Sequence, residues 1–149
     1  KVYITAPDIT ELRSSTGYTV ESIGVLSYAS LTLLSEDQQN EDEFQTDGDF
    51  KLNLAVENLN IVANGLSKFY LSGTANFASF GLYASDARIF SEDLVVETLY
   101  IFQRSTGDMI VNPHLAIRGK IVGVGNVISK NRPPIIEVDE LYRGKLIFQ

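Results

Sequence analysis

Cysteine and tryptophan are absent from this 149-residue chain, and histidine occurs once, at His114. Without cysteine there is no disulfide, thiolate zinc site or cysteine nucleophile. His114 lies in a turn-like NPHLA segment, so we expect a structural or surface role for it and no catalytic triad or multi-histidine metal site. No apolar run approaches the ~18 residues of a membrane-spanning helix. We therefore expect no cofactor and no membrane span.

Acidic residues exceed basic ones in only one part of the chain. The net charge is −7, and seven of the 19 acidic residues lie in SEDQQNEDEFQTDGDF (residues 35–50), which has no Lys or Arg. Elsewhere the charges balance and no basic cluster occurs, so a nucleic-acid partner is not expected. Asp47 and Asp49, with Asp37 or Glu43 nearby, are weak candidates for calcium ligands. The alternative is a solvated acidic loop.

A repeat of 18–20 residues runs through the chain. A small residue recurs at this period in all five units. The position two residues later is always apolar, and the position between them is always polar. This alternation has the period of two that is typical of β-strands. The small positions are Ser67, Ala87, Gly107, Gly125 and Gly144; the polar ones are Lys68, Arg88, Asp108, Asn126 and Lys145; the apolar ones are Phe69, Ile89, Met109, Val127 and Leu146.

Stacked units of this length predict an all-β fold, a parallel β-helix of about six or seven rungs. The period is too short for a propeller blade, and the Leu/Asn consensus of a leucine-rich horseshoe is missing. At a corner, a bulky side chain would collide with the neighbouring rungs, and glycine also permits a positive φ. We predict a single domain over residues 1–149, with N-terminal rungs or a cap (1–34), an acidic loop insertion (35–50) and regular rungs (51–149).

Several segments resemble the GIN-type head domain of auto-transporter adhesins, which belong to secreted or surface-attached proteins of Gram-negative bacteria. The resemblance implies a single-stranded right-handed β-helix and an extracytoplasmic location (secreted, periplasmic or anchored at the outer surface), and it supplies no catalytic motif. Because the chain begins at Lys1 and not at a methionine, a signal segment would precede it. The segments are ANGLSKFYLSGTA (63–75), SDARI (85–89), STGDMIV (105–111), IRGKIVGVGNVI (117–128) and RPPIIEVDELYRGKLIF (132–148).

Two sets of residues are candidates for a functional site. Arg88 and Asp108 should lie on neighbouring rungs with Asp86 nearby. Such a cluster could carry out general acid/base chemistry on a glycan. The alternative is an ordinary surface row of charges. Aromatic residues gather in the middle rungs, and most should pack in the core or stack between rungs. We single out Phe80, Tyr100 and Phe102 as an outer apolar patch for a ligand or for self-association.

These observations favour a non-catalytic extracytoplasmic binding or adhesion module for a surface glycan or protein. One alternative is a carbohydrate-active enzyme on the same scaffold, since β-helices often carry such sites. The other is a structural subunit that self-associates through aromatic faces or rod ends, which predicts a homo-oligomer.

Overall fold

The chain winds into a parallel β-solenoid of about 7 turns. The computed structural model describes residues 1–14, 16–35, 47–84 and 86–149. Within these ranges every regular element is a strand, and all strand pairs are parallel. The predicted all-β parallel solenoid is therefore confirmed. The described residues include no helix long and apolar enough to cross a membrane.

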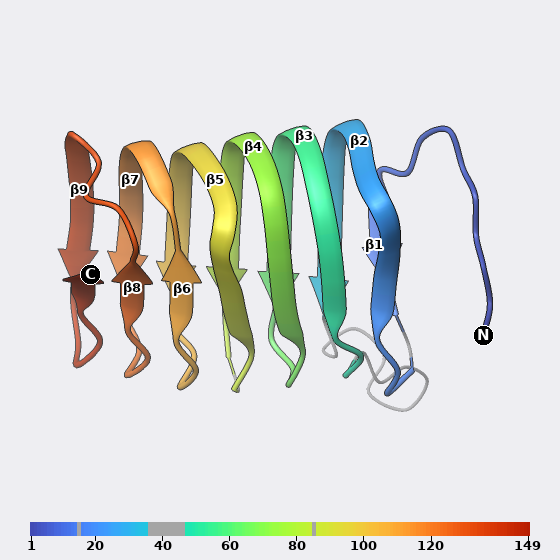
Figure 1. Cartoon of the computed structure of the whole chain (residues 1–149). Helices are drawn as coiled ribbons and strands as arrows, with labels where there is room; N and C mark the ends of the chain where they lie inside the picture. The colour runs from blue at the N-terminus through green and yellow to red at the C-terminus, as the bar shows by residue number, and fades with distance from the viewer. Residues whose placement is uncertain (15, 36–46, 85) are drawn as a thin grey trace.

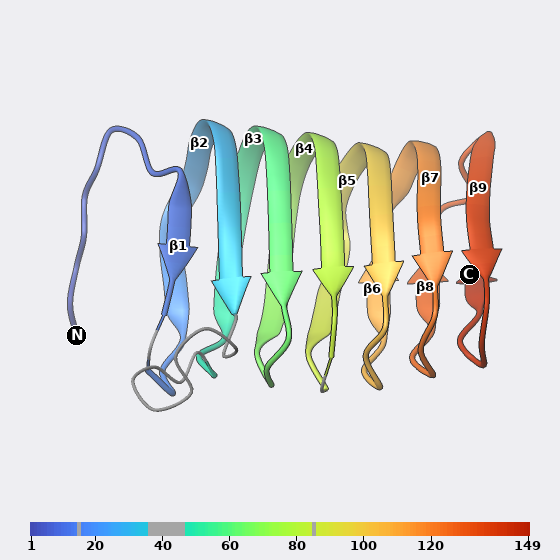
Figure 2. The same ribbon diagram turned by 180° about the vertical axis from the view of Figure 1, so that it is seen from behind.

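Each turn of the solenoid runs up one wall and down the other (Figures 1 and 2). Four long strands, β2 to β5, cover both walls in one piece, whereas later turns are divided into two strands. One division falls at Asn112, directly before Pro113, whose ring nitrogen has no hydrogen to donate to the ladder. The strands are β1 (Glu11–Arg13), β2 (Val20–Ser35), β3 (Phe50–Ala63), β4 (Lys68–Leu82), β5 (Arg88–Gln103), β6 (Met109–Val111), β7 (Pro113–Ile121), β8 (Val127–Ser129), β9 (Ile135–Glu140) and β10 (Leu146–Phe148).

We call the descending side the C-terminal wall: residues 30–35, 58–63, 77–82 and 98–103 of β2 to β5, followed by β7 and β9. The ascending side is the N-terminal wall, formed by the first parts of β2 to β5 with β6, β8 and β10. Figure 2 presents the C-terminal wall to the viewer. Residues 36–46, which hold most of the predicted acidic insertion, lie outside the described residues.

The predicted apolar positions lie side by side on consecutive turns. Strand pairing joins them into one column on the N-terminal wall, in the order Phe50, Phe69, Ile89, Met109, Val127 and Leu146. The first five are buried, and the rings of Phe50 and Phe69 stack with centroids 5.2 Å apart. Each buried side chain of this size contributes about 1.5–3 kcal/mol relative to an exposed one. The repeat thus marks the hydrophobic core.

A β-bulge in β5 shifts the repeat by one residue. Tyr70 pairs with Phe90, but Ser72 pairs with Asp93, so β5 contains one more residue than β4 between these pairs. Beyond the bulge, Ala78 lies in the buried column with Leu59 and Leu99, and Ser79 points outward.

Two glycines allow the turns to approach each other closely. Gly73 and Gly119 have φ values of 104° and 131°. A Cβ atom at either position would lie 1.9 Å from a carbonyl oxygen of the preceding turn, that of Leu54 or Ile101. The small residues of the repeat have a different requirement. A Cβ at Gly125 would lie 2.2 Å from the carbonyl oxygen of Gly107, but no positive φ is recorded there, so the position requires smallness and not unusual backbone freedom.

Replacing Gly73 by alanine should lower the free energy of unfolding by about 2–5 kcal/mol, because it adds a carbonyl clash to a strained φ. Urea denaturation measures the change. Gly17→Ala is the matched control, since nothing lies within 4 Å of its added Cβ. Gly24→Ala, at φ 76° and in open space, isolates the cost of the backbone angle. Equal stability of all three variants would show that the close approach does not constrain the fold.

Glu140 holds the last strand to the solenoid. Its Oε1 accepts a hydrogen bond from the Leu146 N–H at 2.8 Å, and its Oε2 lies 3.0 Å from Lys145 Nζ. The Leu146 N–H bond, and after it the contacts with Lys145, hold the pKa of Glu140 below its ordinary value. Because the folded pKa is the lower one, ionised Glu140 stabilises the fold above the unfolded pKa. This contribution is lost as the pH falls through the folded pKa.

Acidification below the ordinary glutamate pKa of about 4.3 should therefore loosen β10. We expect the NMR signals of Leu146–Phe148 to lose their folded chemical shifts at a higher pH than those of β4. In Glu140→Gln these signals should already be perturbed at neutral pH and should change less on acidification. A wild-type β10 that stays ordered to the same pH as β4 would contradict this role.

Candidate functional site

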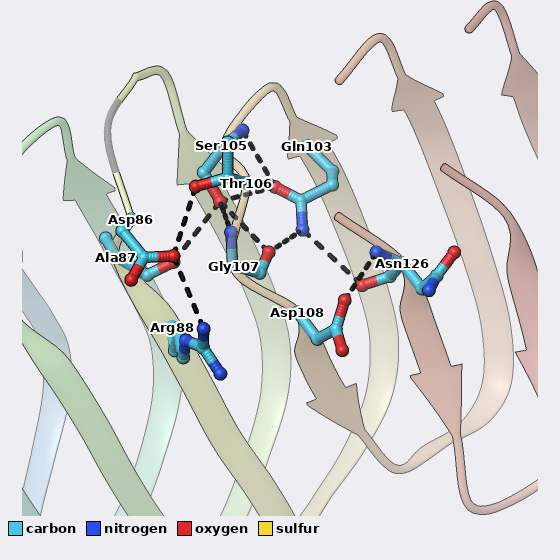
Figure 3. A network of polar contacts seen from close by, with 9 residues as sticks. All are labelled: Asp86, Ala87, Arg88, Gln103, Ser105, Thr106, Gly107, Asp108 and Asn126. Carbon is cyan, nitrogen blue, oxygen red and sulfur yellow. Dashed lines mark hydrogen bonds and ion pairs between the residues drawn. The ribbon is translucent and has the colours of Figure 1, made fainter. Parts of the chain in front are cut away.

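Polar side chains form a network at the turn between β5 and β6 (Figure 3). Gln103 Nε2 donates to the carbonyl oxygen of Gly107 at 2.7 Å, and Gln103 Oε1 accepts from the Ser105 N–H at 3.2 Å. The Ser105 hydroxyl donates to the carbonyl oxygen of Ala87 on the preceding turn at 3.2 Å. Gln103 and Ser105 are fully buried. The network therefore supplies hydrogen bonds to backbone groups that water cannot reach.

The candidate pair Arg88 and Asp108 lies at the edge of this network, on neighbouring turns. Arg88 Nη2 is 3.4 Å from Asp86 Oδ1, which also accepts a hydrogen bond from Thr106 Oγ1 at 3.1 Å. Asp108 Oδ1 accepts the Asn126 N–H of the next turn at 2.7 Å. These side chains thus hold the turns in place.

The hydrogen bond of Asp108 to the next turn has counterparts on other turns. Asp49 Oδ1 accepts the Lys68 N–H at 2.8 Å, and Asn126 Oδ1 accepts the Lys145 N–H at 3.0 Å. In each case a side-chain oxygen binds the backbone N–H one turn later. The sequence signal was the acidic or amide residue that recurs in the polar position of the repeat.

The calcium candidates do not gather into a site within the described residues. Asp49 is engaged with Lys68, and Asp47 is half-buried nearby. Asp37 and Glu43 lie outside the described residues. No group of three or more His, Asp or Glu side chains that could hold a metal ion occurs in the part of the chain that the structure describes. His114 is exposed at the start of β7.

The aromatic candidates occupy three different environments. Phe80 is fully buried in a column with Ile61 and Ile101, so its expected place on the outer surface is wrong. The bulge causes the error, because it aligns Phe80 with inward-pointing Ile101 rather than with Tyr100. Tyr100 is 50% exposed on the C-terminal wall. Phe102 is half-buried and stacks on Tyr83, with ring centroids 5.0 Å apart.

Tyr100 borders an open groove of about 480 Å³ on the outer face of the C-terminal wall. Phe77, which is 58% exposed, is the other aromatic residue in its lining. The other outward residues of the lining are Ser, Thr and Asn, whose side chains are shorter than these two rings. The groove is lined by Ser30, Leu31, Thr32, Asn58, Leu59, Asn60, Phe77, Ala78, Ser79, Thr98 and Tyr100.

None of the 11 lining residues carries a formal charge at neutral pH. Exposed Glu57 and Glu97 directly precede the lining residues Asn58 and Thr98. On the next turn, Arg118 pairs in register with Tyr100 and forms an ion pair with Glu137 at 2.7 Å. Phe77 belongs to the aromatic cluster expected in the middle rungs, but neither it nor Asn58 or Asn60 was among the predicted site residues. The alternation in ENLN (57–60) marks Asn58 and Asn60 as outward-facing, but only the pairing with β2 and β4 shows which neighbours surround them.

Replacing Gln103 by leucine should destabilise the fold although it introduces an apolar side chain into a buried position. The Ser105 N–H would lose its acceptor, and the Gly107 carbonyl would keep only the Ser105 hydroxyl as a donor. An unsatisfied buried group costs about 1–3 kcal/mol. Chemical denaturation measures this loss. Exposed Arg104→Ala is the neighbouring control and should change stability by less than about 0.5 kcal/mol. Unchanged stability in Gln103→Leu would show that the network does not support the turn.

Comparisons with known proteins agree with this architecture. A crystal structure from Bacteroides fragilis, described as a "putative adhesin", is 19% identical to the chain with a TM-score of 0.75. The match covers 88% of this chain and 56% of that protein, so the chain spans little more than half of its length; the likeness shows the fold. No curated protein matches. Residues 1–133 match the family described as "Putative auto-transporter adhesin, head GIN domain", and the chain therefore belongs to this family.

Proposed function

We propose that the domain is a non-catalytic adhesion module that acts outside the cytoplasm and binds its partner in the groove of the C-terminal wall. The observation that carries this proposal is a difference between two sets of polar residues. At the turn edge, the polar side chains are engaged in internal hydrogen bonds. In the groove, the amides of Asn58 and Asn60 make no hydrogen bond with any described residue and lie close to two exposed aromatic rings. The family membership supports adhesion and an extracytoplasmic location.

The wall is a rigid support for these side chains. β3 and β4 are paired on both sides, so their backbone is fixed before a ligand arrives. Binding to a preorganised surface avoids the entropy cost of ordering a loop. Aromatic side chains have few rotatable bonds and bury a large area, which makes Phe77 and Tyr100 suitable central contacts.

The same geometry argues against catalysis in the groove. General acid/base chemistry requires a carboxylate, histidine or similar group within hydrogen-bonding reach of the reacting atoms. The lining offers no such carboxylate or imidazole, and its one titratable side chain is the Tyr100 phenol. Asp86, Arg88 and Asp108, the candidates for an enzyme, lie at the turn edge and bind one another or the adjacent turn.

Self-association is the competing use of the groove, since Phe77 and Tyr100 could pack against a second copy. The groove argues for a different ligand because the Asn58 and Asn60 amides beside the two rings would each need a hydrogen-bond partner in a second copy. We therefore keep the predicted homo-oligomer as an outcome of the experiment that follows.

Beads coated with the domain should adhere to cell surfaces through the groove. We expect the double variant Phe77→Ala/Tyr100→Ala to reduce adhesion to a panel of intact epithelial and bacterial cells by about tenfold or more. Because Tyr70 is 40% exposed on the N-terminal wall, Tyr70→Ala is the matched aromatic control and should adhere like the wild type.

Three results would contradict the proposal. One is equal adhesion of the groove variant and the wild type, provided that both unfold at the same temperature. Another is hydrolysis or cleavage of polysaccharides incubated with the domain, which would make it an enzyme. A third is a concentration-dependent oligomer in light scattering that the groove variant abolishes, which would assign the groove to self-association.

A further inference from the structure

We infer that the ligand of the groove is a neutral glycan, an inference that rests on the proposed function and specifies its ligand. The lining of the groove carries no formal charge. No lining residue could therefore neutralise the charge of a carboxylate, sulfate, phosphate or ammonium group of a ligand. A charged group brought into the groove would lose water without gaining an opposite charge, which is costly. An uncharged ligand carries no such penalty.

The polar side chains of the groove can both donate and accept hydrogen bonds. Asn58 and Asn60 each offer an amide that both donates and accepts, and the lining hydroxyls of Ser30, Thr32, Ser79 and Thr98 do the same. Sugar hydroxyl groups also donate and accept, so a row of such side chains matches a row of sugar hydroxyls in either direction. A ligand with only donors or only acceptors would use half of this capacity.

The contrast with other asparagines shows that these groups are available. The Asn112 amide donates to the carbonyl oxygen of Glu92 at 3.1 Å, and the Asn131 amide donates to that of Pro113 at 2.8 Å. Asn126 Oδ1 is engaged with the Lys145 N–H. Among the described residues, no internal bond of this kind uses the amides of Asn58 or Asn60. They therefore remain free to bind a ligand.

The two aromatic rings of the groove, Phe77 and Tyr100, also suit a sugar ligand. Phe77 lies on β4 in register with Thr98, and Tyr100 lies on β5 in register with Ser79, so the two rings are diagonal neighbours on adjacent turns. One face of a pyranose ring presents C–H groups, which pack on aromatic rings, while its hydroxyls point to the sides. The Phe77 and Tyr100 rings can thus hold the apolar face of a sugar beside the amide and hydroxyl rows.

The rows also define a direction. Asn58, Phe77 and Thr98 form one row across the strands, and Asn60, Ser79 and Tyr100 form the next. Successive turns lie about 4.8 Å apart. A linear oligosaccharide would therefore lie along the solenoid axis and contact one turn after another.

A polypeptide fits this surface less well. Peptides commonly bind a sheet by adding a strand to a free edge, where backbone groups give much of the affinity. In the centre of the groove, β3 and β4 are paired on both sides, so no free edge exists there. Without backbone partners, the amides of a bound peptide would depend on side chains alone.

Calorimetric titration with neutral hexose oligosaccharides tests the inference, with oligogalacturonate as the acidic counterpart. We expect neutral oligosaccharides to bind with an affinity that added salt does not change, because no ion pair forms. Asn58→Ala/Asn60→Ala should weaken binding about tenfold or more. Asn76→Ala is the control, since Asn76 is exposed outside the groove lining, and it should bind like the wild type.

The possible outcomes separate this inference from the proposed function. If no neutral oligosaccharide binds, but Phe77→Ala/Tyr100→Ala still reduces cell adhesion, the glycan assignment is wrong and the adhesion function stands. If the groove variants affect neither measurement, both are wrong. Tighter binding of oligogalacturonate that weakens with salt would replace the neutral glycan by an acidic one. Removal of adhesion by protease treatment of the cells, with no effect of glycosidases, would identify a protein ligand.

Discussion

Every feature of this molecule depends on each turn pairing in register with the turn before it. From β3 onward, the parallel ladder places residues 17–21 positions apart beside one another, so a repeated residue type becomes a column in space. Backbone pairing and core packing are therefore made mostly between turns. Gly73 and Gly119 show how close this approach is, because even a methyl group would overlap a carbonyl oxygen of the neighbouring turn.

The same pairing explains what the sequence could and could not predict. Columns such as Phe69, Ile89 and Met109 follow from period and polarity alone, because only one face of a half-buried strand can be apolar. Phe80 was misplaced because a one-residue bulge reverses which side chains point inward. Tyr100 was predicted to face outward, but its neighbours were not: a groove depends on the heights of side chains on several strands, which a repeat length does not encode.

Polar residues illustrate this limit clearly. Asp108 and Asn60 both occupy outward positions of the repeat, and these positions alone do not show which groups their side chains contact. In the structure, Asp108 accepts a hydrogen bond from an N–H of the next turn. Asn60 lies on a wall whose backbone groups are already paired. Position relative to the turn edge thus separates side chains that stabilise the solenoid from side chains that remain available for a ligand.

This separation explains how a solenoid can change its ligand without losing its fold. The interior is filled by packed side chains, so a ligand can reach only the outward residues of the walls. Those residues contribute little to the core, and substitutions there leave the inward columns and the close-approach glycines intact. The Bacteroides fragilis structure keeps this fold at 19% identity. In the proposed function, recognition therefore depends on a few outward rows, and the turns after Tyr100 carry the ion pair of Arg118 and Glu137.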